Sequence, residues 1–167
     1  MPVNGFSYAI AWSDFTTLTA RPYGVAEDAQ IHPEIGPGKI KLGRKGRSVS
    51  ISAVDIDITL VAQDCWVLSS QNNNSDLLSH EQGHYDIIAI CAREMYNSFI
   101  KLFAASVHEL QTQATKVQET FQRKVAKVDE LYDTQTDHSR NKTNQQTWNH
   151  KIAAEKQKPD GSIDNLP

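Results

Sequence analysis

The segment LLSHEQGHYDI, residues 77–87, places two histidines and a glutamate within five positions: His80, Glu81 and His84. On a helix, residues four apart lie on the same face, so the imidazoles of His80 and His84 can approach one metal ion. Zinc accepts imidazole nitrogen, and a catalytic zinc site uses three protein ligands and leaves one position for water. The metal lowers the pKa of that water to about 7, and Glu81 could accept its proton. The spacing therefore predicts a zinc-dependent hydrolase with Glu81 as general base.

A third zinc ligand must come from elsewhere in the chain. If the helix that carries the two histidines reverses about twenty residues later and the chain runs back over a similar length, the region near Tyr132 returns to their level. The sequence YDTQTDHSR begins at this point, and His138 within it is the predicted third ligand. Asp133 and Asp137 are held in reserve. The other histidines are expected away from this site: His108 near the far turn of the hairpin, His32 in a loop beside a proline, and His150 further along the chain.

Each of these assignments has a plainer alternative. The first two histidines could be polar surface residues of a capped helix turn, and His138 could be a solvated loop residue. Tyr132 could donate a hydrogen bond to a developing oxyanion, or it could be a half-buried tyrosine that closes a helix. The free N–H of a ligating histidine could be accepted by Asp86, Asp133 or Asp137.

The first half of the chain is predicted to consist of strands and loops. From residue 6 to residue 70, the turn formers in RPYG, HPEIGPGK and GRKGR separate short apolar segments. The clearest strand is SVSISAVDIDITLV, residues 48–61, in which apolar and polar residues alternate. The alternation changes register near Ala53, which predicts a β-bulge there or a break into two strands.

The second half is predicted to be helical, because residues 84–158 include neither glycine nor proline. Asn74 or Ser75 can cap the first helix. One unbroken helix over residues 76–131 would be roughly 80 Å long, so we expect a helical hairpin whose reversal lies within residues 104–115. The second arm carries an apolar stripe with helical spacing, formed by Val117, Phe121, Val125, Val128 and Leu131.

The composition indicates one folded domain, assigned to residues 1–158, followed by a loosely ordered tail, residues 159–167. A net charge of -3 provides no global basic field, so nucleic acid is not an expected partner. No apolar run approaches the ~20 residues of a membrane-spanning helix, and no leader opens the chain. We expect an exported protein, periplasmic or secreted, whose leader is absent from this chain; a cytoplasmic protein is the alternative.

The cysteines and two of the tryptophans are predicted core residues. Cys65 and Cys91 are too few for a disulfide framework and lack the spacing of a thiolate zinc site, so they are expected to be buried and small. A bridge between them is the alternative in an exported protein. Trp66 and Trp148 are expected in the core, because large aromatic side chains are mostly buried.

Two segments, HEQGHYDI at residues 80–87 and YDTQTDHS at residues 132–139, resemble a family of uncharacterised bacterial proteins described as zinc-dependent proteases. That family carries an HEQxHFDI-like segment and a later YDxxTxHG-like one. AWSDF, CWV and QQTW also look like family landmarks.

The resemblance implies that His80, His84 and His138 bind zinc and that Glu81 is the general base. Ser139 stands where the family has glycine, so a side chain occupies a position where a positive φ is expected.

Together these features predict a single α+β domain of the zincin-like metalloprotease type, with a small strand-rich half packed on a helical hairpin. The expected activity is zinc-dependent hydrolysis of a peptide or protein substrate. By analogy with that fold, a strand edge within residues 54–63 would hold an extended peptide. The alternatives are a non-enzymatic zinc-stabilised module that binds a protein partner, and a metal-free adaptor that uses the helix over residues 108–131. Glu81 argues against the first alternative, because a structural zinc site needs no base.

Overall fold

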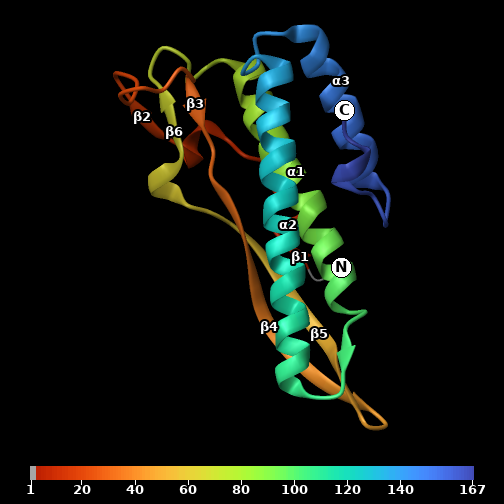
Figure 1. The fold of residues 1–167 in the computed structure, drawn as a ribbon. Coiled ribbons are helices and arrows are strands. Elements are labelled where there is room, and N and C mark those ends of the chain that lie inside the picture. Colours follow the sequence, from red (N-terminus) through yellow and green to blue (C-terminus); the bar gives the residue numbers. More distant parts are fainter. Residues whose placement is uncertain (1–2) are drawn as a thin grey trace.

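The computed structural model describes residues 3–167, and three helices in it lie beside two small sheets (Figure 1). The helices are α1 (Ser75–Phe99), α2 (Val107–Thr136) and α3 (Lys142–Gln157). The predicted α+β class is confirmed. The helical hairpin corresponds to α1 and α2, whereas α3 is a separate helix that the sequence analysis did not distinguish. No helix among the described residues carries an apolar stretch that could cross a bilayer.

The first sheet is built on a long antiparallel hairpin of β4 (Pro33–Lys45) and β5 (Ser48–Leu60). The other edge of β5 pairs with β1 (Val3–Asn4) in parallel and with β7 (Phe103–Ala104) in antiparallel orientation. Strand β4 therefore forms one edge of this sheet, and the end of the hairpin extends beyond the helices (Figure 1).

The change of register within β5 is a β-bulge. Lys41 pairs with Ala53 and Leu42 pairs with Ile51, so Ser52 has no partner on β4. The extra residue lets Ile51 and Val54 both face the core, although they are three positions apart. The predicted bulge is confirmed, and the strand continues through it.

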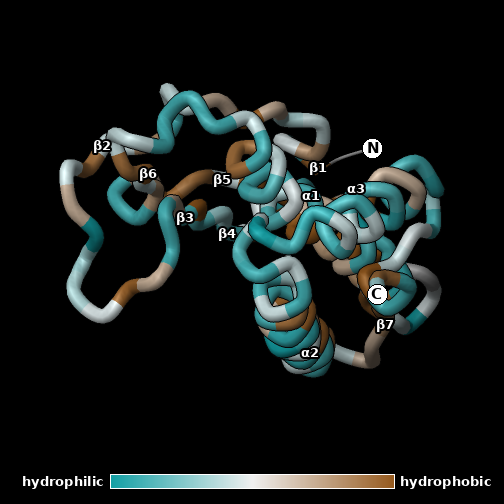
Figure 2. The backbone as a smooth tube through the Cα atoms, turned by 90° about the horizontal axis from the view of Figure 1, so that it is seen from above, coloured by the Kyte–Doolittle hydropathy of each residue, from teal (hydrophilic) through white to brown (hydrophobic). Residues whose placement is uncertain are grey.

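The second sheet has the order β2–β6–β3, with β2 (Thr16–Leu18) parallel and β3 (Ala29–Gln30) antiparallel to β6 (Trp66–Leu68). Short 3-10 turns, η1 (Trp12–Asp14) and η2 (Ala62–Asp64), flank these strands. Viewed from above, this sheet lies to one side of the helices (Figure 2). Strand β3 is its edge strand on the side of α1, which it contacts.

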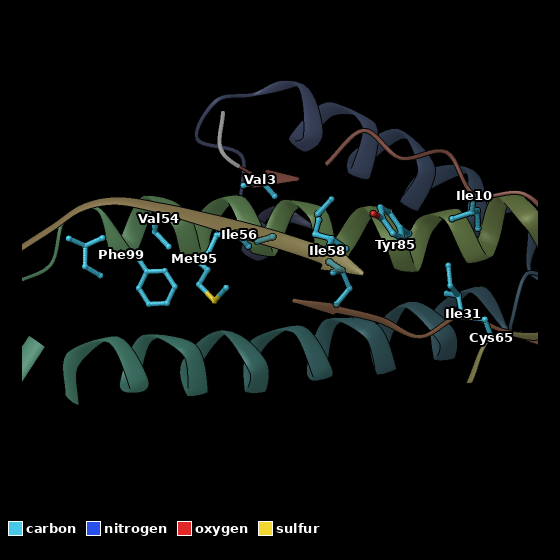
Figure 3. Packing of buried hydrophobic residues seen from close by; sticks show 14 of the residues in the cluster. Val3, Ile10, Ile31, Val54, Ile56, Ile58, Cys65, Tyr85, Met95 and Phe99 are labelled. Atoms are coloured by element: carbon cyan, nitrogen blue, oxygen red, sulfur yellow. The ribbon is translucent and has the colours of Figure 1, made fainter. Parts of the chain in front are cut away.

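Helix α1 begins at Ser75 because the side chain of Asn74 accepts hydrogen bonds from the backbone amides of Asp76 and Leu77. The prediction of a cap at this point is confirmed. The helix is buried on most of its surface, since it packs on β5, α2 and α3. Figure 3 shows side chains of α1, among them Tyr85, Met95 and Phe99, in the same cluster as residues of β5.

The predicted cysteine and tryptophan core residues behave as expected. Cys65 and Cys91 are fully buried and free, and Trp66 and Trp148 are buried. The buried apolar residues form two clusters, one that includes residues of β5 and α1 and a second around Tyr132 and Trp148. The apolar stripe of α2 packs against these clusters through Val117, Phe121, Val125 and Val128, although Leu131 stays exposed. Most of this stripe therefore serves the core, which leaves little of it for the adaptor alternative.

The chain reverses between the helices at residues 100–106, earlier than expected and overlapping the predicted range only at its start. Ser106 caps α2 by accepting from the amide of Glu109. Helix α2 then runs back for 30 residues, which is longer than α1. The return to the level of His80 therefore occurs as predicted, near Tyr132.

The expected loosely ordered tail is instead packed on the helices. Ile163 is buried within η3 (Ile163–Asn165), and its amide donates to Glu94 Oε2 over 3.0 Å. Glu155 accepts from the amide of Ser162 and from the side chain of Asn165. The sequence contains few apolar residues here, but Ile163 and Leu166 pack on the core while Glu94 and Glu155 accept hydrogen bonds from the tail.

Candidate metal centre

The packing of α1 on α2 brings three potential metal ligands together. His80 and His84 project from α1, and Asp133 projects from α2. Their ligand atoms all lie within 4.8 Å of one another. The Nε2 atoms of the two histidines are 3.2 Å apart, and each lies 3.1 Å from Asp133 Oδ1. Two zinc–nitrogen bonds of ~2.05 Å at the tetrahedral angle would separate the nitrogens by ~3.3 Å, so the histidine pair already has a suitable spacing.

The other ring nitrogens of both histidines face oxygen acceptors. His80 Nδ1 lies 3.0 Å from Gln145 Oε1, and His84 Nδ1 lies 2.6 Å from Asp129 Oδ1. The amide of Gln145 is oriented by its Nε2, which donates to Tyr132 and to Asn149 Oδ1, so its oxygen faces the imidazole. Both histidines therefore carry a proton on Nδ1.

When both imidazoles are neutral, this assignment leaves their Nε2 lone pairs directed at the carboxylate of Asp133. Two nitrogen lone pairs and an anionic oxygen within about 3 Å repel one another unless a proton or a metal cation lies between them. An imidazole that donates from one nitrogen to a carboxylate or amide while the other is free to coordinate is the usual state of a zinc-bound histidine. The residues present therefore fit zinc.

The charges of the cluster are strongly coupled. Burial lowers the pKa of His80. Burial also opposes protonation of His84, but the charge and hydrogen bond of Asp129, together with the hydrogen bond to Asp133, hold the pKa of His84 well above its ordinary value. Burial acts against ionised Asp133 too, yet its close contacts with His80 and His84 lower the pKa of its carboxyl. In the metal-free protein the positive charge of the cluster therefore sits on His84.

Glu81 lies beside this cluster in a pocket of about 300 Å³. Its side chain is 3% exposed, and this burial is the main reason why the pKa of Glu81 is raised to about 7. The far wall of the pocket is formed by residues 27–31, which include β3. The pocket thus holds a cluster of candidate metal ligands, a buried carboxyl group and a strand edge.

The strand that lines the pocket is not the predicted one. Residues 54–60 belong to β5, which is an inner strand paired with β4 and, at Ile56 and Asp57, with β1. None of these residues lines the pocket, and the wall beside Glu81 is β3. Local alternation identified the best strand but could not show which strand edge would face α1.

His138, the predicted third ligand, lines the same pocket but does not belong to the group of converging ligand atoms. Its Nδ1 lies 3.4 Å from Asp133 Oδ1, and its Nε2 lies 3.6 Å from Glu27 Oε1. Asp133, one of the residues held in reserve, is the residue that approaches both histidines of α1. Asp137, the other, is exposed and pairs with Arg140.

The turn that carries His138 has an unusual backbone. Three consecutive residues other than glycine, Asp137, His138 and Ser139, have φ values of 48°, 48° and 75°. The expected positive φ at Ser139 is therefore confirmed, and the two residues before it share this conformation. Such a left-handed run costs free energy for residues with a Cβ, so the rest of the site must hold it in place.

Tyr132 does not face the pocket. Its hydroxyl donates to the carbonyl oxygen of His80 over 3.1 Å and accepts from Gln145 Nε2 over 2.6 Å. The side chain is fully buried, with its ring stacked on the imidazole of His80. The oxyanion role of Tyr132 stays a prediction; in this structure the residue supports the backbone and the ring of His80.

The histidine partners Asp129 and Gln145 were missed by the sequence analysis. Asp86, one of the predicted partners, instead forms an ion pair with Lys156 at 2.6 Å. Asp129 could have been recognised, because it precedes Asp133 by four residues and so lies on the same face of α2. Gln145 falls within QQTW, a segment already singled out as a family landmark.

Residues 66–139, a little under half of the chain, match a family described as "Bacterial protein of unknown function (DUF922)". The matched region spans β6, α1, α2 and the turn that carries His138, and so contains every candidate ligand. The resemblance to an uncharacterised bacterial family is confirmed at this level, and the description assigns no activity. No curated protein and no solved structure matches the chain.

Proposed function

We propose that this chain is a zinc-dependent peptidase that binds its metal through His80, His84 and Asp133. The observation that carries the proposal is the convergence of the three ligand atoms within 4.8 Å, next to the buried carboxyl group of Glu81. Two imidazoles and one carboxylate form one of the ligand sets of catalytic zinc, which leaves a position for water. His138 orients the carboxylate of Asp133 in this arrangement.

Two features favour an enzyme over a zinc-stabilised binding module. Structural zinc sites are usually closed by four protein ligands, whereas this cluster opens onto a pocket. A structural site also has no use for a buried carboxyl group beside the first ligand, whereas the role of general base would explain why the cost of burying Glu81 is tolerated.

The chemistry follows from the positions of the side chains. When bound, zinc supplies a Lewis acid and a water molecule of lowered pKa. Glu81 would accept the proton of the attacking water and transfer it to the leaving amine of the peptide. Asp129 and Gln145 hold the two imidazoles in the orientation and tautomer that binding requires.

The edge of β3 would position the substrate. Residues 27–31 form the wall opposite α1, and the outer edge of β3 carries no strand among the described residues. An extended peptide could add to this edge by main-chain hydrogen bonds, which would place a peptide bond across the pocket. As in the zincin-like arrangement expected from the sequence, a strand edge would then hold the substrate beside the helix that carries the two histidines. The strand would be β3 rather than the one within residues 54–63.

Replacement of Glu81 by glutamine tests the proposal. Glu81→Gln keeps nearly the same volume and leaves the ligands intact, but it removes the proton acceptor. We expect zinc content and the melting temperature to be retained, while cleavage of an unstructured protein falls by at least the ~10² to 10⁴ typical of general-base assistance. Zinc is measured by elemental analysis and cleavage by release of new amino termini.

Glu119→Gln, an exposed substitution on α2, is the matched control and should cleave like the wild type. Equal cleavage by Glu81→Gln with zinc still bound would refute the mechanism. A wild-type protein that retains zinc but cleaves neither a casein-type substrate nor a broad peptide library would favour the binding module.

A further inference from the structure

The end of the molecule opposite the pocket has an unusual charge. We call it the basic end and define it as residues 38–50, around the β4–β5 turn, and residues 98–108, which connect α1 to α2 (Figure 1). These two segments contain six of the 17 lysines and arginines and none of the 20 aspartates and glutamates. The rest of the chain therefore carries 11 basic against 20 acidic residues. A protein with a net charge of -3 thus has one strongly positive end.

Strand pairing joins the two segments of the basic end into one surface. Phe103 pairs with Ser50 and Ala104 pairs with Val49, so β7 lies against β5 close to the hairpin turn. Arg44, Arg47 and Lys101 are exposed on this surface. Glu109, the nearest acidic residue in the sequence, is engaged in accepting from the amide of Ala105 over 3.0 Å.

Exposed apolar side chains gather at the same end. Five of the eight large apolar residues that are exposed among residues 3–167 belong to it: Ile40, Leu42, Ile100, Phe103 and Val107. Phe103 is 70% exposed and Leu42 is 50% exposed. Such residues scattered singly need no explanation, but their concentration among cations marks an interaction surface.

We propose that the basic end docks onto the surface of a bilayer that contains anionic phospholipids. Cations attract the anionic headgroups, and apolar side chains between them can enter the acyl boundary just below. The basic end has both the cations and the exposed apolar side chains that such binding requires. A nucleic acid would satisfy the cations through its phosphates but would leave Ile40, Leu42 and Val107 without an apolar environment.

Protection of a strand edge is not a sufficient explanation for this surface. Lys39 and Lys41 lie on the edge strand β4, where lysines discourage pairing with another chain. That role does not account for Lys101 or for the exposed Phe103 and Val107, which lie outside β4. Because both segments contribute cations and exposed apolar side chains to the same end, a binding surface explains these residues better than edge protection does.

Docking in this way would leave the pocket accessible. The pocket lies at the amino-terminal part of α1, whereas the basic end begins at its carboxyl terminus. A helix of 25 residues is about 37 Å long, so the bilayer and the pocket would be separated by most of the length of α1. The inference is independent of the proposed peptidase activity, because it involves none of the same residues.

Co-sedimentation of the full chain with lipid vesicles tests the proposal. We expect binding to phosphatidylcholine vesicles that contain about 30% phosphatidylserine, little binding to pure phosphatidylcholine, and weakening as salt rises from about 0.05 M to about 0.5 M. Each cation near such a surface contributes about fivefold, so Arg44→Gln, Arg47→Gln and Lys101→Gln together should weaken binding on the order of a hundredfold. Leu42→Ser with Phe103→Ser should weaken binding even at low salt.

The matched control neutralises three exposed cations elsewhere, with Arg123→Gln, Lys127→Gln and Lys151→Gln. It changes the net charge equally and should bind nearly as the wild type does. Circular dichroism verifies that each variant is folded. The proposal is overturned by absence of binding to anionic vesicles at low salt, by equal weakening in the control, or by a short DNA duplex that binds while vesicles do not.

Discussion

The ring of Tyr132 stacks on the imidazole of His80 with the ring centroids 4.7 Å apart, and its hydroxyl donates to the carbonyl oxygen of the same histidine. A side chain of α2 thus fixes both the ring and the backbone of the first histidine of the HExxH segment. The candidate metal centre is therefore a product of the packing of α1 on α2, rather than of α1 alone.

Replacement of Tyr132 by phenylalanine distinguishes a supporting role from an oxyanion role. Phenylalanine keeps the stacked ring but leaves the buried amide of Gln145 without one partner, which should lower the free energy of unfolding by about 1–3 kcal/mol. We expect kcat/KM to fall less than tenfold. Loss of an oxyanion donor costs about 10² to 10³ in kcat. A fall of that size with zinc and stability retained would place the hydroxyl in the pocket.

Gly83 permits this close approach of α2. A Cβ at Gly83 would overlap the Tyr132 hydroxyl and lie 2.6 Å from Tyr132 Cζ. Alanine in a helix is ordinarily favoured over glycine by up to about 1 kcal/mol, but the fully buried tyrosine has no room to move. Gly83→Ala should therefore destabilise the protein by about 1–3 kcal/mol in urea unfolding. Gly36→Ala, where a Cβ meets nothing within 4 Å, is the control, and equal effects of the two substitutions would contradict this explanation.

The features that the sequence predicted correctly are local ones. The HExxH spacing, the Asn74 cap and the bulge at Ser52 each follow from residues a few positions apart, whose geometry is fixed by the period of a helix or strand. The sequence also predicted that α2 passes His80 near Tyr132, because the constant rise per residue of a helix converts a number of residues into a length.

The features that escaped prediction depend on contacts distant in the sequence. Gln145 lies 65 residues from His80, and β3 reaches the pocket only because it pairs with β6. Asp133 was a reserve candidate for the third ligand because the choice between it and His138 depends on how the chain leaves α2. The left-handed turn at residues 137–139 directs His138 toward Glu27, and no periodicity encodes such a turn.

Strain at Ser139 can be relieved by glycine. Its φ of 75° costs a residue with a Cβ about 1–2 kcal/mol, of which the extra freedom of glycine in the unfolded chain offsets roughly 0.4–1 kcal/mol. Ser139→Gly should therefore raise the free energy of unfolding by up to about 1.6 kcal/mol. Ser139→Ala removes the hydroxyl but keeps the Cβ, so it should give no gain. Stabilisation by alanine as large as that by glycine would show that strain is not the cause.

Glu155 makes the packing of the tail dependent on pH. Hydrogen bonds from Lys158, Asn165 and the amide of Ser162 lower the pKa of its carboxyl to about 2. Because this pKa is below that of the unfolded chain, its contribution is fully present above pH ~4.5 and is lost as the pH falls toward 2. Glu155→Gln should therefore be less stable than the wild type at neutral pH, and the difference should shrink as urea unfolding is repeated at lower pH. Lys158→Met, which removes the largest cause of the shift, should reduce this pH dependence; a difference that grows on acidification would contradict the assignment.

Matched substitutions can distinguish Asp133 from His138 as the third metal ligand. If Asp133 binds the metal and His138 orients it, Asp133→Ala should weaken zinc binding more than 100-fold, whereas His138→Ala should weaken it by the ~10- to 100-fold typical of an orienting partner. Competition with a chromophoric chelator measures both affinities, with the exposed Asp137→Ala as control.

A ligand that binds only the folded state stabilises it, so chelation should lower the melting temperature of the wild type and leave that of Asp133→Ala nearly unchanged. Greater loss of zinc in His138→Ala than in Asp133→Ala would instead restore the set of three histidines that the sequence suggested.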